Sequence, residues 1–185
     1  MRIAFLLNSR VPSNNAHVLQ TVRMCEAFAA NGHEVTLHYP NRYQSNPDLL
    51  DVSIEEYLDV NETFETQSYV YPDMNYFREF VGRECGPQLL FSRAFFTLYV
   101  GLRMLWEDAD LYYTRGCYIA WILVALDLPT VFETHRTEYG GLGNWLVGRF
   151  GSRRNCLSVV TLTDRTATNL QSLGVPSDRI QVLPD

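Results

Sequence analysis

The segment from Asp110 to Tyr139 constrains the fold most, because it changes from a strand pattern to a helix pattern and back. Asp110–Thr114 is a short apolar run with two tyrosines, which is typical of a strand, and Gly116 interrupts it. Tyr118–Leu128 is almost wholly apolar and too long for one strand, so it predicts a helix. Thr130–Thr134 is β-branched and aromatic and predicts a second strand.

A strand, a helix and a second strand in so short a segment predict two parallel strands joined by a right-handed crossover. Pro129 is expected to end the helix, because it cannot donate the next backbone N–H. Since the helix Tyr118–Leu128 is apolar all round, we expect it to be buried on several sides.

Polar residues follow the second strand directly and form the first candidate site. In open α/β sheets the carboxyl ends of the strands line the ligand crevice, so these side chains are candidates for substrate binding. His135 is either a ligand contact or a histidine whose hydrogen bonds are satisfied at the strand end. Arg115 ends the first strand of the unit and either holds an acceptor anion or pairs with a nearby carboxylate. The polar residues after the second strand are Glu133, His135, Arg136 and Glu138.

The N-terminal part of the chain repeats the strand, helix and strand pattern. Arg2–Asn8 is a continuous apolar run, a helix pattern begins at about Ala16, and Glu34–Tyr39 alternates as a second strand. The helix is expected to end at Asn31-Gly32 with a left-handed cap. Its apolar face is formed by Val18, Val22, Cys25 and Ala29.

The polar turn before that helix is the second candidate site. Ser13, Asn14 and Asn15 are all good N-cap residues, and the free N–H groups of a helix that starts at Ala16 can also hold an anion. The turn has no G-x-G-x-x-G sequence, which argues against a dinucleotide cofactor bound there. These residues therefore either meet a phosphate or only cap the helix.

Further strand patterns at Leu157–Leu162 and Ile180–Leu183 extend the alternation of strands and helices, which predicts an α/β fold. We expect a Rossmann-like three-layer α/β/α arrangement with a mainly parallel sheet and helices on both faces. Thr163 or Asp164 is expected to cap the helix between these two strands. The strands expected to form one parallel sheet are Ile3–Leu7, Val35–Tyr39, Leu111–Thr114, Val131–Thr134 and Val159–Leu162.

Residues 41–73 give the weakest pattern. The run NPDLLDVSIEEYLDV suits a helical turn or two, and Phe64–Tyr71 alternates weakly as a strand. This insertion either shapes a substrate pocket or is a surface excursion. Met74–Arg83 and Pro87–Trp106 both predict helices. The most apolar longer stretch, Leu89–Trp106, spans fewer residues than a bilayer requires.

The charge and the cysteine content exclude several classes of function. With 15 basic and 21 acidic residues the net charge is −6, which gives no electrostatic basis for nucleic-acid binding. The four cysteines form no C-x-x-C pair and no zinc-ligand spacing, so buried thiols are favoured over disulfides. One basic cluster, Arg149, Arg153 and Arg154, suits a helix C-terminus, a phosphate or an anionic membrane surface.

Three stretches together resemble the N-terminal half of a family 4 glycosyltransferase with the GT-B architecture. The first is the opening strand, turn and helix that run into NGHEVTLHYP. The second is YYTR…LPTVFETH, and the third is VVTLTDRTATNLQSLGVPSDRIQVLPD. The resemblance covers most of the chain and is weakest over Asn41–Arg83. The order and spacing of the three stretches make it specific.

The resemblance implies a two-domain enzyme that transfers a sugar from a nucleotide sugar to a glycan, lipid or small-molecule acceptor. Retention at the anomeric carbon is implied, with no cofactor and no obligatory metal. Residues 1–185 are then the N-terminal, acceptor-side domain, and the C-terminal domain that binds most of the donor is absent from the chain. The 185-residue piece alone is expected to be inactive, and its end at Asp185 is interpreted as a cut before that domain.

The resemblance also implies roles for the candidate residues. His135 occupies the position of a histidine that contacts the donor sugar in several members, and it is the predicted catalytic residue. The turn Ser13–Ala16 occupies the place that faces donor phosphate and acceptor, although it departs from the family by lacking glycines. The predicted substrate-binding residues are Ser13, Asn14, Asn15, Ala16, Arg115, Glu133, Arg136 and Glu138.

Two other functions stay open at this point: a sugar-nucleotide epimerase of the same architecture, and a non-catalytic Rossmann-like binding module. No signal peptide is expected, because Arg2 stands alone and Ile3–Leu7 is too short for its apolar core. We therefore expect a cytoplasmic protein, with peripheral contact at the inner face of the membrane as an option. Its expected partners are the nucleotide sugar, the acceptor and its own C-terminal domain, and nucleic acid is not among them.

Overall fold

The computed structural model describes residues 1–9, 11–13, 15–41, 60, 64–70 and 86–183. The chain divides into two compact units, Met1–Val100 and Gly101–Asp185, which are described in turn. The predicted helices at residues 46–60 and Met74–Arg83 lie, apart from Val60, outside the described residues.

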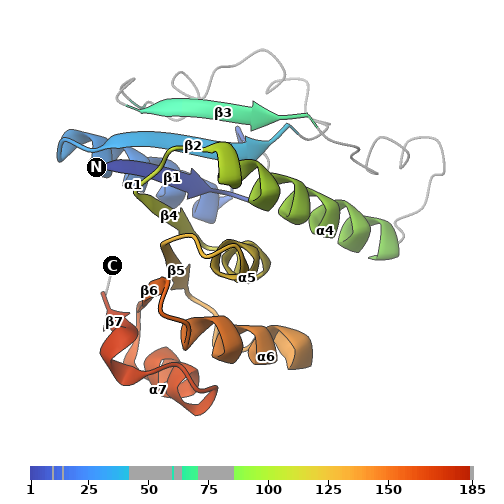
Figure 1. The fold of residues 1–185 in the computed structure, drawn as a ribbon, viewed down its shortest axis with the longest axis vertical. Helices are drawn as coiled ribbons and strands as arrows, with labels where there is room; N and C mark the ends of the chain where they lie inside the picture. Colours follow the sequence, from blue (N-terminus) through green and yellow to red (C-terminus); the bar gives the residue numbers. More distant parts are fainter. Residues whose placement is uncertain (10, 14, 42–59, 61–63, 71–85, 184–185) are drawn as a thin grey trace. The chain divides into compact units, whose positions relative to one another are not determined.

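The first unit holds the strands β1 (Arg2–Leu6), β2 (Glu34–Pro40) and β3 (Glu65–Tyr69), in the spatial order β3-β2-β1 (Figure 1). Both neighbouring pairs are parallel, with Leu6 opposite His38 and His38 opposite Gln67. The weak alternation predicted at Phe64–Tyr71 therefore contains a strand, which runs from Glu65 to Tyr69. This unit also contains α1 (Ala16–Ala30) and most of α4 (Gly86–Arg103).

Helix α1 follows the sequence prediction closely. Its buried side chains include Val18, Val22 and Cys25, which recur at the spacing of one helical face. After the C-cap Asn31, Gly32 has a φ of +83°, a backbone region that glycine enters without steric cost. The N–H of His33 then donates to the carbonyl of Phe28 at 3.2 Å, which completes the left-handed cap.

The second unit alternates strands and helices from the end of α4 onward. Its strands have the spatial order β4-β5-β6-β7, and every neighbouring pair among them is parallel. Two short 3-10 helices, η3 (Met104–Trp106) and η4 (Ser177–Arg179), precede β4 and β7. The strands and helices are β4 (Leu111–Thr114), α5 (Cys117–Ala125), β5 (Thr130–Thr134), α6 (Gly140–Gly151), β6 (Cys156–Thr161), α7 (Asp164–Ser172) and β7 (Ile180–Val182).

One hydrophobic cluster joins α5, α6 and α7 to the same face of β5 and β6, with Phe132 of β5 near its centre. The ring of Phe132 packs edge-on against Phe150 of α6, with 5.2 Å between centroids. Thr163 caps α7 as predicted, because its side chain accepts a hydrogen bond from the N–H of Thr166. The predicted Rossmann-like α/β fold with parallel strands is confirmed.

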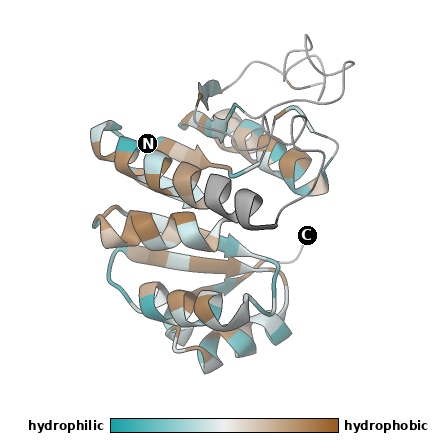
Figure 2. Cartoon of the chain, turned by 90° about the vertical axis from the view of Figure 1, so that its right-hand side faces the viewer, coloured by the Kyte–Doolittle hydropathy of each residue, from teal (hydrophilic) through white to brown (hydrophobic). Residues whose placement is uncertain are grey.

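Two predictions for α5 are wrong. The helix ends at Ala125, before Pro129, because Asp127 adopts a left-handed conformation with φ +61° and the N–H of Leu128 bonds back to the carbonyl of Leu123. The helix is also not buried on several sides, because its buried residues, Ile119, Ala120, Leu123 and Val124, share one face. Tyr118 and Trp121 lie exposed on its outer side. Figure 2 shows that hydrophobic residues predominate in the helices of this unit.

Cys25 and Cys156 are buried and Cys117 is partly buried, and all three are free thiols, as predicted. Cys85 lies outside the described residues. Among the described residues, no helix has both the length and the apolar character needed to cross a bilayer.

Candidate functional site

A buried carboxylate, Glu133, organises the candidate site at the carboxyl end of β5. Its Oε2 accepts a hydrogen bond from the Tyr113 hydroxyl at 2.7 Å. Its Oε1 is shared by the Arg115 guanidinium, which forms an ion pair with it, and by Nε2 of His135 at 2.7 Å. We call Tyr113, Arg115, Glu133 and His135 the Glu133 cluster.

Strand register explains why these residues meet. In the parallel β4–β5 pair, Tyr113 lies opposite Val131, so both side chains point to one face of the sheet. Alternation along β5 then puts Glu133 on that face and Phe132 on the opposite one, within the helix-covered core. The site and the hydrophobic core therefore use opposite faces of one short strand.

Glu133 is only 3% exposed, yet its surroundings favour the ionised carboxylate. Burial alone would raise its pKa, but hydrogen bonds from Arg115, Tyr113 and His135 and the charge of Arg115 hold that pKa below the usual value. The same carboxylate acts on its neighbour: burial, and then the charge of Glu133, raise the pKa of the Tyr113 hydroxyl. Tyr113 is thus a neutral hydrogen-bond donor.

His135 is the partly open member of the Glu133 cluster, with a third of its side chain exposed. An ionised carboxylate can only accept hydrogen bonds, so the nitrogen that faces Glu133 must carry a proton. In a neutral imidazole this leaves Nδ1 as an acceptor. Arg115 pairs with a carboxylate, which was one of the two roles considered for it.

The loop after β5 is anchored at several points. The Thr134 hydroxyl accepts a hydrogen bond from the N–H of Arg136 at 3.1 Å and forms another with the hydroxyl of Tyr139. The N–H of Tyr139 donates to the Asn144 side chain at 3.0 Å, and the Asn169 amide donates to the carbonyl of Thr137. Gly140 and Gly141, which follow this loop directly, both belong to α6.

Arg136 and Glu138 do not join the Glu133 cluster. Both side chains are exposed and make no hydrogen bond or ion pair within the described part of the chain. Their position beside His135 still leaves them accessible to a ligand. The sequence does not identify Tyr113, Thr134 and Tyr139 as residues of the site, because tyrosine and threonine are common in strands and loops.

The second predicted site lies in the first unit, and its hydrogen bonds differ from the N-cap bonds that were expected. Asn15 holds the N-cap position of α1, but its side chain makes no capping hydrogen bond. Instead the buried Ser13 hydroxyl accepts a hydrogen bond from the N–H of Asn15 at 3.3 Å. Ala16 is exposed at the helix start, and Asn14 lies outside the described residues.

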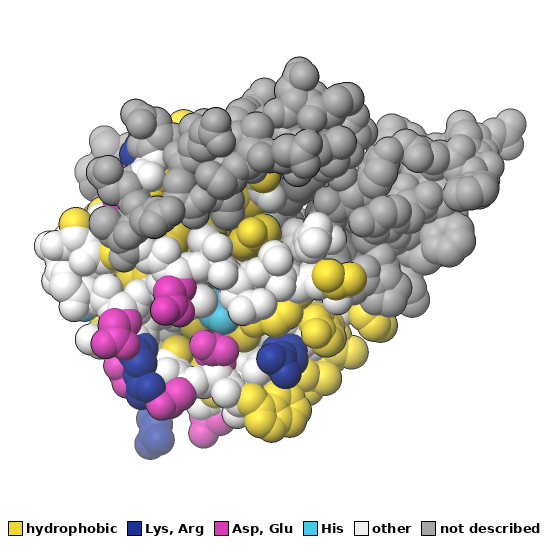
Figure 3. Space-filling model, turned by 90° about the horizontal axis from the view of Figure 1, so that it is seen from above, with side chains coloured by type: hydrophobic (Ala, Val, Ile, Leu, Met, Phe, Trp, Pro, Cys, Tyr) yellow, Lys and Arg dark blue, Asp and Glu magenta, His cyan; other side chains and the backbone are white. Residues whose placement is uncertain are grey.

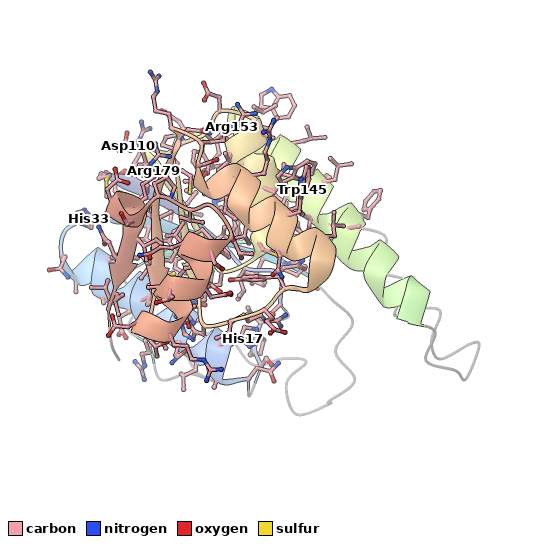
Figure 4. All side chains as sticks on the ribbon, turned by 90° about the horizontal axis from the view of Figure 1, so that it is seen from below. His17, His33, Asp110, Trp145, Arg153 and Arg179 are labelled. Atoms are coloured by element: carbon pink, nitrogen blue, oxygen red, sulfur yellow. The ribbon has the colours of Figure 1, made fainter. Side chains whose placement is uncertain are left out.

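His17 lies one residue into α1, and its Nε2 is 2.6 Å from the Ser9 hydroxyl (labelled in Figure 4). This contact ties the start of α1 to the residues after β1, in keeping with a structural role for His17. Among the described residues, no group of three or more His, Cys, Asp or Glu side chains could hold a metal ion.

Arg153 and Arg179, both labelled in Figure 4, lie at the other end of the second unit. The Arg179 guanidinium donates to the carbonyl of Arg153, in the turn that precedes β6. This turn is at the amino end of β6, whereas the Glu133 cluster is at the carboxyl end of β5. Arg153 therefore contributes nothing to the Glu133 cluster.

Solved structures with the same fold include HepE of Anabaena in complex with UDP and glucose, with a TM-score of 0.61 and 12% identity over 100% of this chain and 44% of that one. UDP-GlcNAc 2-epimerase of Methanocaldococcus jannaschii has a TM-score of 0.61 and 11% identity over 98% of this chain and 45% of that one. The lipopolysaccharide outer core galactosyltransferase WaaB, in its apo form, has a TM-score of 0.60 and 9% identity over 100% of this chain and 46% of that one.

The chain therefore spans less than half the length of these three proteins. No curated protein matches the sequence. The sequence model of the protein family Glycosyltransferase Family 4 matches residues 18–185, which include parts of both units of the chain. The chain belongs to glycosyltransferase family 4.

Proposed function

We propose that residues 1–185 form the acceptor-side domain of an enzyme that transfers a sugar from a nucleotide sugar to an acceptor, with retention at the anomeric carbon. The observation that carries the proposal is the buried, ionised Glu133, which orients a half-open histidine at the carboxyl end of β5. Ligands of open α/β sheets bind at this edge. The complex of HepE with UDP-glucose supports a nucleotide sugar as the donor class.

In this proposal His135 meets a hydroxyl of the donor sugar through Nδ1, and it is the catalytic residue of the domain. Glu133 is a positioning residue, since it touches His135 and not the sugar. Arg115 neutralises the carboxylate, and Tyr113 fixes its second oxygen. Arg136, Glu138 and the turn Ser13–Ala16 are proposed contacts for acceptor or phosphate.

The rest of the machinery is proposed to lie in a C-terminal domain that binds most of the donor. The share of the related structures that the chain covers, 44% to 46% for the three proteins named above, supports this proposal. We propose that no metal or cofactor is obligatory and that the enzyme works in the cytoplasm.

The test uses the full-length protein with a panel of nucleotide sugars and with glycan, lipid and small-molecule acceptors. We expect transfer with one donor class, and NMR of the product should show that the anomeric configuration of the donor is kept. Residues 1–185 purified alone are expected to give no turnover above a heat-denatured control. Turnover by this piece would contradict the two-domain proposal, and inversion at the anomeric carbon would contradict retention.

The second candidate is a sugar-nucleotide epimerase, which the likeness to the Methanocaldococcus jannaschii epimerase favours. The two reactions separate cleanly in one assay. An epimerase converts the nucleotide sugar to its epimer with no acceptor present, whereas a transferase releases the nucleotide only when it has an acceptor or water to react with. A full-length protein that does neither, but still binds the nucleotide sugar, would instead be a binding module.

A further inference from the structure

All three tryptophans of the chain are exposed to solvent in the second unit. Trp106 in η3 is 74% exposed, Trp121 in α5 is 39% exposed and Trp145 in α6 is 61% exposed. Figure 4 labels Trp145 on the outer side of α6. Tryptophan is usually highly buried, so three exposed indoles on consecutive helical elements call for an explanation.

Other large apolar side chains surround them on the same elements. Figure 3 shows hydrophobic side chains gathered on one flank of the surface, beside a basic side chain. We define the tryptophan face as the following exposed residues: Leu102, Leu105, Trp106, Tyr118, Trp121, Leu142 and Trp145.

The elements of the tryptophan face pack directly against one another. Gly101, at the end of α4, is in such close contact with Ile122 of α5 that a Cβ at Gly101 would overlap the Ile122 side chain. Helix α5 in turn packs on α6 through the core cluster that contains Ala120, Val124 and Leu146. The last turn of α4, helix α5 and helix α6, which carry most of the exposed residues, therefore pack in succession against one another.

The charges on this layer have one sign. Neither α5 nor α6 contains an acidic residue, and Arg149 is the only charged residue in the two helices. Arg103 adds a second exposed cation at the end of α4. The acidic residues nearest in sequence lie outside these helices, in the segments that flank them: Glu107 and Asp108 after η3, Asp127 after α5 and Glu138 before α6.

We propose that the tryptophan face binds the surface of a membrane that contains anionic lipid. Indole and phenol rings with an apolar body and a polar edge suit the headgroup region, and arginine at the same depth pairs with lipid phosphate. A second copy of the chain is a poorer occupant, because a symmetric contact through α5 and α6 offers no carboxylate to either Arg149.

Docking through this face leaves the Glu133 cluster accessible. Phe132 of β5 points into the core beneath α5 and α6, whereas Glu133 points to the opposite side of the strand. The membrane would therefore contact the helix layer without covering the site. The proposal is independent of which reaction the enzyme performs.

The test is co-sedimentation of the full-length protein with vesicles of phosphatidylcholine alone and of phosphatidylcholine mixed with phosphatidylglycerol. We expect binding to the mixed vesicles that weakens as salt is added. The double variant Trp106→Ser/Trp145→Ser should bind at least about tenfold more weakly, because two indoles lose their burial in the interface. Arg103→Gln/Arg149→Gln should lose the preference for anionic vesicles.

The matched control is Leu157→Ser, which changes an exposed apolar residue of β6 outside the tryptophan face and should leave binding unchanged. Circular dichroism must show that all variants are folded. The proposal is overturned if the wild type ignores both vesicles, or if the control weakens binding as much as the double variant. It is also overturned if ultracentrifugation shows a dimer that the tryptophan changes dissociate, since a second copy would then occupy the face.

Discussion

Nε2 of His135 lies 2.7 Å from Oε1 of Glu133, two residues earlier in the chain. The two side chains can meet because residues two apart in a strand share a face, and β5 ends between them. The buried residue of the pair is a carboxylate held in its ionised form, and the exposed residue is the histidine that it orients. The first two predictions test this division of roles.

Replacing His135 with alanine in the full-length enzyme should lower kcat/KM at least about tenfold, which corresponds to ~1.4 kcal/mol of lost transition-state stabilisation. The melting temperature should change little, because Glu133 keeps its bonds to Arg115 and Tyr113. His33→Ala, in the turn before β2, is the matched control and should leave kcat/KM unchanged. An unchanged kcat/KM in His135→Ala would remove His135 from the proposed mechanism.

Replacing Glu133 with glutamine should destabilise the fold by about 2–3 kcal/mol, because the half-buried Arg115 loses its counter-charge. Tyr113→Phe removes one hydrogen bond from the same carboxylate and should cost only about 1 kcal/mol. Both values come from urea unfolding. In ¹⁵N NMR the wild-type His135 should carry its proton on Nε2, and Glu133→Gln should give a mixture of tautomers. A single unchanged tautomer in the variant would show that Glu133 does not position the ring.

Stability should fall as the pH drops from about 6.5 to about 4, because of the buried His38. Desolvation lowers the pKa of this imidazole from 6.5 to about 4, and its Nε2 has no hydrogen-bond partner among the described residues. As the pH falls, His38 therefore becomes protonated in the unfolded chain before it does so in the folded protein. The contribution of neutral His38 to the free energy of unfolding is complete above pH 6.5 and is lost below it. The full effect is about 3 kcal/mol.

The check is the free energy of unfolding measured across this pH range for the wild type and for His38→Gln. We expect a shallower slope in the variant. The variant will also be less stable at neutral pH, because the 2.8 Å contact between His38 Nδ1 and the Tyr69 hydroxyl is altered. Parallel slopes for the two proteins would mean that His38 titrates normally in the folded state.

Two glycines of α6 should respond to alanine in opposite ways. A Cβ at Gly148 would overlap the carbonyl oxygen of Leu173, so Gly148→Ala should destabilise by about 1–3 kcal/mol despite the better helix propensity of alanine. Gly141 has nothing within 4 Å of an added Cβ, so Gly141→Ala should stabilise by about 0.5–1 kcal/mol. The measurement is thermal unfolding of the two variants and the wild type. Equal changes in melting temperature for the two variants would contradict the packing described for Gly148 and Gly141.

Much of the fold could be predicted from the sequence, because apolar periodicity and turn residues are local signals. Asn31-Gly32 marks the end of α1, and the polarity after Thr134 marks the carboxyl end of β5. The left-handed Asp127 could not be predicted in the same way, since glycine is the usual residue in that conformation and aspartate adopts it only occasionally. The exposure of α5 was missed because an apolar sequence does not say whether a neighbour covers it.

Part of the candidate site could also be predicted from the sequence. The sequence identifies Glu133, His135 and Arg115 as candidates because they lie at strand ends. Their hydrogen-bond partners depend on the strand register. Tyr113 donates to Glu133 only because β4 aligns Tyr113 with Val131, two residues before the carboxylate on the same face. A single sequence does not contain that alignment.

The division of β5 between its two faces has a consequence for how the sequence of this protein can change. Phe132 supports the core and Glu133 supports the site, and they are neighbours in a strand of five residues. Inserting or deleting one residue there would exchange the two, placing a charge in the core and a phenyl ring at the ligand edge. We therefore expect changes in ligand preference to arise at Arg136, Thr137 and Glu138, whose side chains are exposed after the end of β5.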